Sequence, residues 1–410
     1  MATGAGTAAV TADDVARARP AVVDVVVRTP VLRSAALSDR CAAEVVLKAE
    51  SLQRTGSFKL RGALAKIAAL GPACERGVTA GSAGNHGWAL SAAAATRAVP
   101  CEVFMPEHAP LAKIEGCDAL GATVRVAGES IEDALTAARL RADEAGMTFV
   151  HPFDDPVIVA GQGTLGLELL EDVQRLAKII VPVGGGGLVS GVAIAVKSAR
   201  PDVEVVGVQV EAAAAYPASL RGGSPVTVKG AVTIADGIAV KRPGDVTLPL
   251  VREWVDDVIV VGEDEVAEAM VLLVERARLV VEGAGAVGVA ALLGGHTRAA
   301  EGGTTCVVLS GGNVDAGLLA SVARRHETEA GRRLVLFSRV PDRPGALARM
   351  LTQVAEAGAN LVDVEHLREG VDLHVRETGV QLVLETRGRD HAAQVVDGLR
   401  AAGYDAVVVR

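Results

Sequence analysis

Short runs of β-branched residues alternate with Ala- and Leu-rich stretches through residues 20–320 of the chain. The runs expected to form strands are residues 45–47, 103–105, 123–126, 179–183, 205–210 and 305–309. The stretches expected to form helices include residues 63–70, 88–98, 131–144 and 264–279. Strands separated by helices are typical of βαβ units around a parallel sheet. The sequence therefore predicts an α/β fold for this part of the chain.

The pattern changes beyond the charged stretch 324–333. Strands are expected at residues 334–340, 360–367, 380–386 and 404–409, with helices at 346–356 and 392–401. This order, βαββαβ, is that of a ferredoxin-like domain. We therefore predict a first domain over residues 1–325, with a smaller lobe at roughly 50–155. A linker over 326–333 and a second domain over 334–410 are expected to follow it.

Charge and hydropathy narrow the possible partners. The chain carries a formal net charge of −9 without a long basic run, so a nucleic-acid-binding surface is not expected. Apolar stretches such as 284–293 are too short to span a membrane, and Met1–Val10 lacks the basic residues of a signal peptide. The five scattered cysteines show neither disulfide nor metal spacing. We expect a cytoplasmic protein with reduced thiols.

Glycine-rich loops follow two of the expected strands. Gly184-Gly185-Gly186-Gly187 follows Val183, and Gly311-Gly312 comes shortly after Leu309. Ligands of open α/β sheets bind at the carboxyl ends of the strands. Four glycines let consecutive backbone N–H groups turn toward one anion, and the next helix adds the positive end of its dipole. The tetraglycine is a candidate phosphate loop, although a flexible turn is the alternative.

Lys59, in the segment Thr55–Gly62, is the candidate reactive lysine. A lysine that reacts through its amine must lose its proton near neutral pH, and burial or cationic neighbours achieve this. Phe58 either offers an apolar wall beside it or belongs to the ordinary core. A solvated surface lysine is the alternative, so the assignment depends on the other motifs.

Further motifs lie at expected strand ends or helix starts. They are Ser82-Ala83-Gly84-Asn85-His86, Glu282-Gly283-Ala284-Gly285-Ala286 and Ser310-Gly311-Gly312-Asn313. Backbone N–H groups at the first of these helix starts suit a carboxylate, although Ser82 and Asn85 are also suited to cap that helix. Glu282 either favours the dipole of the helix that it precedes or serves a site.

Together with His151–Pro156 and Ala235–Val240, these motifs resemble the threonine dehydratases (threonine ammonia-lyases) of the tryptophan-synthase-β type. The resemblance extends from about Thr11 to Arg410. These are fold-type II pyridoxal-phosphate enzymes, so the resemblance implies a two-lobed catalytic domain and that cofactor. It also implies β-elimination of L-threonine to 2-oxobutanoate and ammonia, with L-serine giving pyruvate.

The resemblance implies roles for the residues that contact the cofactor. Lys59 would hold it through a Schiff base and move the α-proton of the substrate. The loop Gly184–Gly187, with Leu188, would bind the phosphate, and Asn85 the ring oxygen. Phe58 would pack against the ring.

It likewise implies the surroundings of the substrate and of the pyridine nitrogen. The segment Ser82–His86 would bind the substrate carboxylate, with Glu282 nearby. Ser310 would face the pyridine nitrogen, where a neutral hydroxyl favours elimination over transamination.

The sequence departs from the family pattern at three places. Gly87-Trp88-Ala89 replaces the usual Ala-Gln-Gly, which leaves open a preference for another 3-hydroxy amino acid. Ala83 stands where serine racemases carry a second serine, which favours a lyase over a racemase. Glu211 matches an acid that binds a cation in some relatives, but Pro217 replaces the second acid. A magnesium site is therefore not expected, whereas a monovalent cation at Glu211 remains open.

The C-terminal domain resembles an ACT-type regulatory module through Pro341–Leu347 and Gly358–Asn360. An amino-acid effector would bind near Asp342, Arg343 and Gly345, with allosteric control of a step in isoleucine biosynthesis. A purely structural dimerisation domain is the alternative. In either case we expect a homodimer or a homotetramer.

Two other functions agree less well with the sequence. Cysteine synthases share the fold and perform β-replacement, but they lack a matching C-terminal domain. An inactive amino-acid sensor would not need the reactive lysine, and here Lys59, Asn85, Gly184–Gly187 and Ser310 are all intact.

Overall fold

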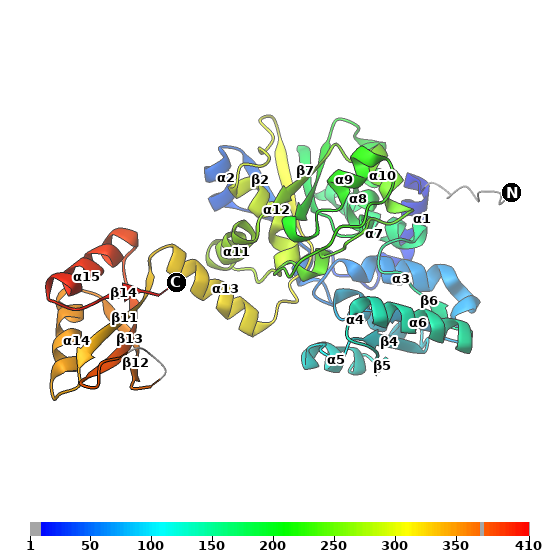
Figure 1. Cartoon of the computed structure of the whole chain (residues 1–410). Helices are drawn as coiled ribbons and strands as arrows, with labels where there is room; N and C mark the ends of the chain where they lie inside the picture. The colour runs from blue at the N-terminus through cyan, green and yellow to red at the C-terminus, as the bar shows by residue number, and fades with distance from the viewer. Residues whose placement is uncertain (1–9, 370–372, 410) are drawn as a thin grey trace. The chain divides into compact units, whose positions relative to one another are not determined.

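A six-stranded sheet organises the larger lobe of the first unit of the chain, Met1–Val314 (Figure 1). The computed structural model describes residues 10–369 and 373–409. The strands follow the order β1 (Val31–Arg33), β2 (Glu44–Ala49), β10 (Thr304–Leu309), β7 (Leu176–Pro182), β8 (Glu204–Val210) and β9 (Asp257–Val261). All neighbours pair parallel except β1 with β2. Helices cover both faces of such a sheet, which explains why its strands are continuous apolar runs.

A second, smaller sheet consists of four parallel strands. Its order is β5 (Thr123–Val126), β4 (Cys101–Met105), β3 (Val78–Gly81) and β6 (Thr148–Phe149). The helices around it are α3 (Lys59–Leu70), α4 (Asn85–Ala95), α5 (Leu111–Asp118) and α6 (Ile131–Ala145). The two sheets confirm the predicted α/β architecture with two lobes.

The remaining helices of this unit belong mainly to the larger lobe. They are α1 (Ala12–Val23), α2 (Ala35–Cys41), α7 (Pro156–Asp172), α8 (Gly187–Ala199), α9 (Tyr216–Gly222), α10 (Thr247–Trp254), α11 (Glu263–Leu272) and α12 (Gly283–Leu293). The expected helix 264–279 is divided, because a π-helix at Leu273–Ala277 follows α11. Short 3-10 helices occupy Glu50–Leu52, Gly71–Cys74, Glu211–Ala213 and Asp236–Ile238.

The second unit, Asp315–Arg410, contains the predicted βαββαβ order. Its elements are β11 (Arg333–Pro341), α14 (Ala346–Glu356), β12 (Asn360–Leu367), β13 (Glu377–Glu385), α15 (Arg389–Ala401) and β14 (Val407–Val408). The strands pair antiparallel in the order β12-β13-β11-β14, which is the ferredoxin-like arrangement. Its own core includes Met350, Val354, Val395 and Leu399.

The segment 326–333, for which the sequence predicts a linker, is mostly regular structure. Helix α13 (Ala316–Glu329) continues into it, and β11 begins at Arg333. The charges that suggested a linker also suit an exposed helix, since Arg325 pairs with Glu329 at 2.9 Å one helical turn away.

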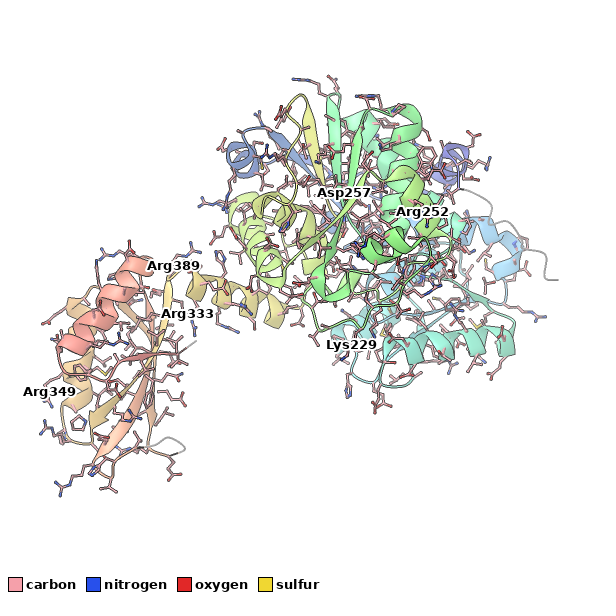
Figure 2. All side chains as sticks on the ribbon, turned by 45° about the horizontal axis from the view of Figure 1, so that its top comes forward. Lys229, Arg252, Asp257, Arg333, Arg349 and Arg389 are labelled. Carbon is pink, nitrogen blue, oxygen red and sulfur yellow. The ribbon has the colours of Figure 1, made fainter. Side chains whose placement is uncertain are left out.

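Charged side chains lie mainly outside the two cores. Figure 2 labels examples from both units, among them Lys229 and Arg252 of the first and Arg349 and Arg389 of the second, all exposed. None of the helices within residues 10–369 and 373–409 is long and apolar enough to cross a membrane. The five cysteines are free thiols, and four of them are buried. Residues 1–9, which hold most of the segment judged not to be a signal peptide, lie outside the described residues.

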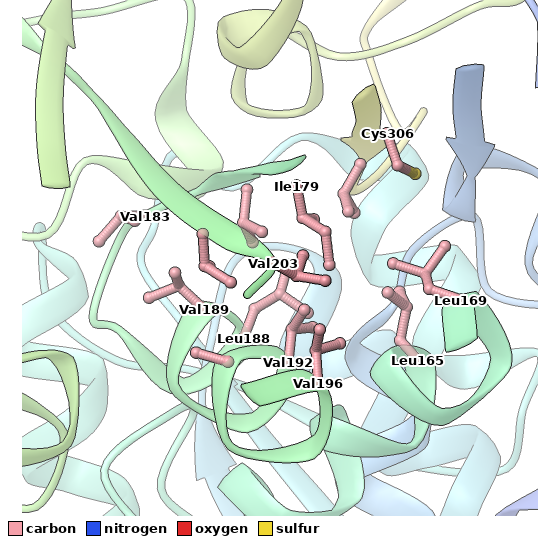
Figure 3. Packing of buried hydrophobic residues seen from close by; sticks show 14 of the residues in the cluster. Leu165, Leu169, Ile179, Val183, Leu188, Val189, Val192, Val196, Val203 and Cys306 are labelled. Carbon is pink, nitrogen blue, oxygen red and sulfur yellow. The ribbon is translucent and has the colours of Figure 1, made fainter. Parts of the chain in front are cut away.

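The core of the larger lobe packs β7 against helices on one face of the sheet. Leu165 and Leu169 of α7, Ile179 of β7, and Val192 and Val196 of α8 meet there, as Figure 3 shows. These side chains are all fully buried. The start of α8 is therefore held firmly at the carboxyl end of β7.

Candidate active site

A pocket in the first unit gathers segments that are far apart in the sequence. Its lining consists of Phe58, Lys59, Asn85, Pro152, Phe153, Ile158, Gln162, Pro182, Gly184, Gly185, Gly186, Gly187, Leu188, Gly237, Ile238, Val240, Glu282, Ala284 and Ser310. All the residues predicted to contact the cofactor are among them. Of the predicted substrate segment, Asn85 lines the pocket, whereas Ser82, Ala83, Gly84 and His86 do not.

The parallel sheets explain this convergence. Strands β7 and β10 are parallel neighbours, so the loops that follow them, at Gly184 and Ser310, meet at one edge. Strands β3 and β6 are parallel neighbours in the smaller sheet, so the loops at Ser82 and His151 meet in the same way. The pocket thus receives residues from the carboxyl ends of both sheets.

Lys59 is the first residue of α3 and is half-buried. Its Nζ donates a hydrogen bond to the carbonyl oxygen of Pro152 at 2.9 Å. Burial lowers the pKa of Lys59 to about 8, against the opposing effect of the Glu282 charge. An amine with such a pKa is unprotonated far more often at neutral pH than an exposed lysine.

The segment before Lys59 is joined to the loop that follows β10. Phe58 N–H donates to the carbonyl oxygen of Ser310 at 3.0 Å, and Ser57 forms an antiparallel bridge with Gly311. Gly56 has a φ of +69°, and a Cβ at this position would overlap the side chain of Asn313. The lysine and Ser310 are therefore held in one rigid arrangement.

A buried ion-pair cluster fixes α3 from its other side. Arg61 lies two residues after Lys59, and its guanidinium contacts Glu50 at 2.8 Å and Glu168 at 2.7 Å. Arg61 and Glu50 side chains are both 0% exposed. Burial alone would raise the pKa of Glu50, but Arg61 holds it below the usual range. Arg61 belongs to the Thr55–Gly62 motif, but the sequence does not show that it pairs with Glu50 and Glu168.

The tetraglycine loop leads into α8 and leaves the start of that helix open. Gly186 is the N-cap residue, with a φ of +94°, and no side chain caps α8. A Cβ on Gly185 would overlap the ring of Phe153, and one on Gly186 would overlap the hydroxyl of Tyr216. Glycine is therefore required at both positions, while the first N–H groups of α8 are free of a side-chain cap.

Asn85 and Glu282 form a hydrogen-bonded chain with Asn313. Asn85 Nδ2 donates to Glu282 Oε1 at 2.7 Å, and Asn313 Nδ2 donates to Asn85 Oδ1 at 2.8 Å. Burial and the charge of Asp236 raise the pKa of Glu282 to about 7, although Asn85 and nearby lysines act in the opposite direction. Glu282 is the N-cap residue of α12 but makes no side-chain cap bond. Its carboxylate thus faces the pocket residues instead of capping the helix.

Ser82 organises the turn before α4. Its Oγ accepts hydrogen bonds from Gly84 N–H at 3.2 Å and from Gly87 N–H at 3.0 Å, which satisfies one N–H of the first turn, although Gly84 is the N-cap residue. His86 is buried, and its Nε2 lies 3.0 Å from the carbonyl oxygen of Val150. Burial lowers the pKa of His86 to about 3, so this side chain is neutral at physiological pH.

Trp88, the departure expected to reshape the substrate pocket, lies outside the pocket lining. Its Nε1 donates to the carbonyl oxygen of Lys113 at 2.9 Å, and a Cβ on Gly116 would overlap the indole. The side chain therefore packs against α5. The sequence could not reveal this, because it does not show which face of α4 meets α5.

The predicted cation and effector residues lie elsewhere. Glu211 is exposed at the start of its 3-10 helix and is absent from the pocket lining. Among the residues that the structure describes, no group of three or more His, Cys, Asp or Glu is arranged to hold a metal ion. In the second unit, Asp342 pairs with Arg368 at 2.8 Å. Gly345, with a φ of +83°, is the N-cap residue of α14, and Arg343 is exposed.

Several residues in the pocket or behind its lining are not indicated as site residues by the sequence. Phe153 packs on the glycine loop, and Asn313 orients Asn85. Both lie in motifs that carry the family resemblance, which is the one signal that could have pointed to them. Tyr216 and Thr247 donate hydrogen bonds to the carbonyl oxygen of Gly185 from outside the pocket lining. Only the tertiary structure shows that they contact the loop.

Comparisons with known proteins agree with this geometry. The family model described as "Pyridoxal-phosphate dependent enzyme" matches residues 22–311. L-threonine ammonia-lyase of Thermotoga maritima is 43% identical over 98% of this chain and 100% of that protein. The catabolic L-threonine dehydratase TdcB of Escherichia coli is 41% identical over 74% of this chain and 93% of that protein.

Solved structures show the same relationship. A threonine deaminase of T.th. superposes with a TM-score of 0.70 at 39% identity, covering 74% of this chain and 99% of that one. Maize serine racemase superposes with a TM-score of 0.73 at 35% identity, covering 78% of this chain and 99% of that one. The chain therefore belongs to the pyridoxal-phosphate-dependent enzyme family and, within that family, to the group of the L-threonine ammonia-lyases.

Proposed function

We propose that this enzyme eliminates water from L-threonine to give 2-oxobutanoate and ammonia, and converts L-serine to pyruvate in the same way. One observation carries the proposal. The amine of Lys59, whose pKa is lowered to about 8, shares a single pocket with the open glycine loop, Asn85, Glu282 and Ser310. The similarity to L-threonine ammonia-lyases along nearly the whole chain supports the choice of substrate.

The residues present fit pyridoxal phosphate. The uncapped start of α8 and the loop Gly184–Gly187, where any Cβ on Gly185 or Gly186 would be excluded, suit its phosphate. Lys59, Asn85 and Ser310 line the same pocket and would hold the rest of the molecule. When bound, the cofactor supplies an electron sink that stabilises the charge left after removal of the α-proton.

The chain's own residues would position and move protons. With a pKa of about 8, the Lys59 amine is unprotonated often enough near neutral pH to accept a proton, and the carbonyl oxygen of Pro152 holds that amine in place. Glu282, with a pKa of about 7, both holds and releases a proton near neutral pH. Asn85 fixes the direction of that carboxyl. The N–H groups at the start of α4 would bind the substrate carboxylate.

The decisive experiment measures 2-oxo acid formation from L-threonine, L-serine and bulkier 3-hydroxy amino acids. We expect L-threonine and L-serine to react and Lys59→Ala to abolish the activity. If neither reacts while a bulkier analogue does, the substrate assignment is wrong. If purified protein stays colourless after incubation with pyridoxal phosphate, the enzyme proposal itself fails.

Racemisation of serine is a second candidate, supported by the superposition on maize serine racemase. Ala83 argues against it, because a methyl group cannot act as a base on the opposite face of the substrate. Chiral chromatography would decide: D-serine formed from L-serine at a rate comparable to pyruvate would favour the racemase.

We further propose that the second unit regulates the first. The start of α14 has no side-chain cap, so its first N–H groups, which follow Asp342, Arg343 and Gly345 in the chain, would bind an amino-acid carboxylate. Assays of the full chain with L-isoleucine and L-valine test this. No change in rate at saturating effector would favour a structural role for the unit.

Assembly, cation binding and cellular role also remain proposals. Strand β12 is an exposed edge with Leu361, Val362 and Val364 accessible, which suits pairing with a second copy in a homodimer or homotetramer.

A monovalent cation at Glu211 would be supported if activity depended on K⁺ and if Glu211→Gln removed that dependence. A cytoplasmic location and a place in isoleucine biosynthesis rest on the sequence and its resemblance.

A further inference from the structure

We infer that Tyr216 and Thr247 are positioning residues for the phosphate of the cofactor, acting through the carbonyl group of Gly185. The inference rests on the proposed use of Gly184–Gly187 as the phosphate loop. Neither residue lines the pocket, and neither is near the loop in sequence. They act by fixing the direction of the peptide group between Gly185 and Gly186.

Two hydroxyl groups hold the same carbonyl oxygen. Thr247 Oγ1 donates to the oxygen of Gly185 at 2.6 Å, and Tyr216 Oη donates to it at 3.0 Å. The two hydroxyls are 3.1 Å apart. Tyr216 and Thr247 are both 0% exposed, so no solvent competes for this oxygen. The carbonyl is therefore held in one direction.

The planarity of the peptide bond transmits this constraint to the next N–H group. In a trans peptide, the carbonyl of one residue and the N–H of the following residue point in opposite directions. The Gly185 oxygen points toward Tyr216 and Thr247, which lie outside the pocket lining, whereas Gly185 and Gly186 line it. The Gly186 N–H is thereby directed to the pocket side, where an anion would accept its hydrogen bond.

Other buried contacts fix the hydroxyl of Thr247 and the backbone of Tyr216. Thr247 Oγ1 accepts a hydrogen bond from Gly244 N–H at 3.2 Å, and Tyr216 N–H donates to Gln209 Oε1 at 2.9 Å. Asp154 Oδ1 accepts from the N–H groups of Val246 at 2.9 Å and Thr247 at 3.2 Å, which anchors the start of α10.

Phe153, the neighbour of Asp154, completes the support. Its ring lies where a Cβ on Gly185 would be. Residues of the 151–155 turn thus restrain both the loop and the hydroxyl that holds it. A site prepared in this way binds its ligand without reorganising first.

A buried tyrosine needs a hydrogen-bond partner in any core, so the contact alone is compatible with a purely structural role. The two roles differ in what they predict for ligands with and without a phosphate. Pyridoxal retains the aldehyde and the ring of the cofactor but lacks the phosphate. A positioning role weakens the binding of pyridoxal phosphate and leaves that of pyridoxal unchanged.

The experiment measures dissociation constants of both compounds for Tyr216→Phe, Thr247→Val and the double variant, by absorbance of the cofactor on the full chain. We expect the double variant to bind pyridoxal phosphate about tenfold more weakly. We expect its affinity for pyridoxal to match that of the wild type. The ³¹P resonance of the bound phosphate should also shift in these variants.

Two controls keep the result interpretable. Thr247→Ser retains the hydroxyl and should bind pyridoxal phosphate as the wild type does. Tyr404→Phe removes the other tyrosine hydroxyl, in the second unit, and should also leave this affinity unchanged. Equal weakening of both ligands, or no change in the double variant, overturns the inference. If the double variant fails to fold, the single variants and the ³¹P shift decide. Failure of wild-type protein to bind pyridoxal phosphate would instead overturn the proposed function.

Discussion

The side-chain amide of Asn85 donates a hydrogen bond to the carboxyl group of Glu282 at 2.7 Å, joining the first turn of α4 to the N-cap of α12. The two residues are 197 positions apart in the sequence. Glu282 is 6% exposed, and its pKa is raised to about 7. The contact therefore holds a carboxyl group that titrates near neutral pH in the same pocket as Lys59.

The first prediction concerns the stability of the cofactor-free protein as a function of pH. The pKa of Glu282 is higher in the folded than in the unfolded chain, so its stabilising contribution is complete at low pH. It is lost as the pH rises through about 7. Relative to Glu282→Gln, the free energy of unfolding of the wild type should fall between about pH 4.5 and 7, by at most about 1.4 kcal/mol per unit.

Urea titrations of both proteins across this range measure the effect. A constant difference between wild type and Glu282→Gln would contradict the raised pKa. Exposed Glu132→Gln serves as the control and should show no such change near pH 7.

The second prediction concerns Lys59. Because its pKa is about 8, the rate at which the protein captures added pyridoxal phosphate should rise with pH and level off above about 8. Stopped-flow absorbance follows the reaction. Lys59→Ala should not show the absorbance change of Schiff-base formation, whereas Lys229→Ala, which changes an exposed lysine, should behave as the wild type. A rate that keeps rising to pH 10 would mean that burial does not lower the pKa.

The third prediction concerns the ion-pair cluster behind α3. Arg61→Leu would remove the arginine that pairs with Glu50 and one of the two cations that pair with Glu168. We expect this to lower the free energy of unfolding by about 3–5 kcal/mol. Arg125→Ala removes an exposed partner of Glu102, whose pairing is screened by solvent, and should cost far less than Arg61→Leu. Denaturant unfolding of the two variants gives the comparison. Similar small losses would show that the buried cluster does not stabilise the lobe.

The fourth prediction concerns Trp88. Its indole packs against α5 and is absent from the pocket lining, so Trp88→Phe should reduce stability without changing substrate preference. The ratio of kcat/KM for L-threonine to that for L-serine should remain within about twofold, because a change in a distant packing contact affects both substrates equally. A reversal of this ratio of kcat/KM values would show that the indole of Trp88 takes part in substrate selection.

Local patterns in the sequence were sufficient for most of the fold. The alternation of strand and helix periodicities predicted both the α/β unit and the βαββαβ unit, and α14 and β12 have the expected bounds. The glycine loops, together with the family resemblance of the ordered motifs, predicted that Lys59, Asn85, the tetraglycine and Ser310 share one site. These features are encoded over a few residues each, where backbone conformation depends mainly on neighbours in the chain.

Only the tertiary structure decided what surrounds those residues. The sequence does not indicate that Asn313 orients Asn85, that Arg61 is neutralised by Glu50 and Glu168, or that Trp88 faces α5. Nor does it indicate that two hydroxyls hold the Gly185 carbonyl. The lowered pKa of Lys59 likewise depends on tertiary structure, because the groups that desolvate its amine, and Glu282 whose charge opposes the shift, meet only when the strands of both sheets have paired.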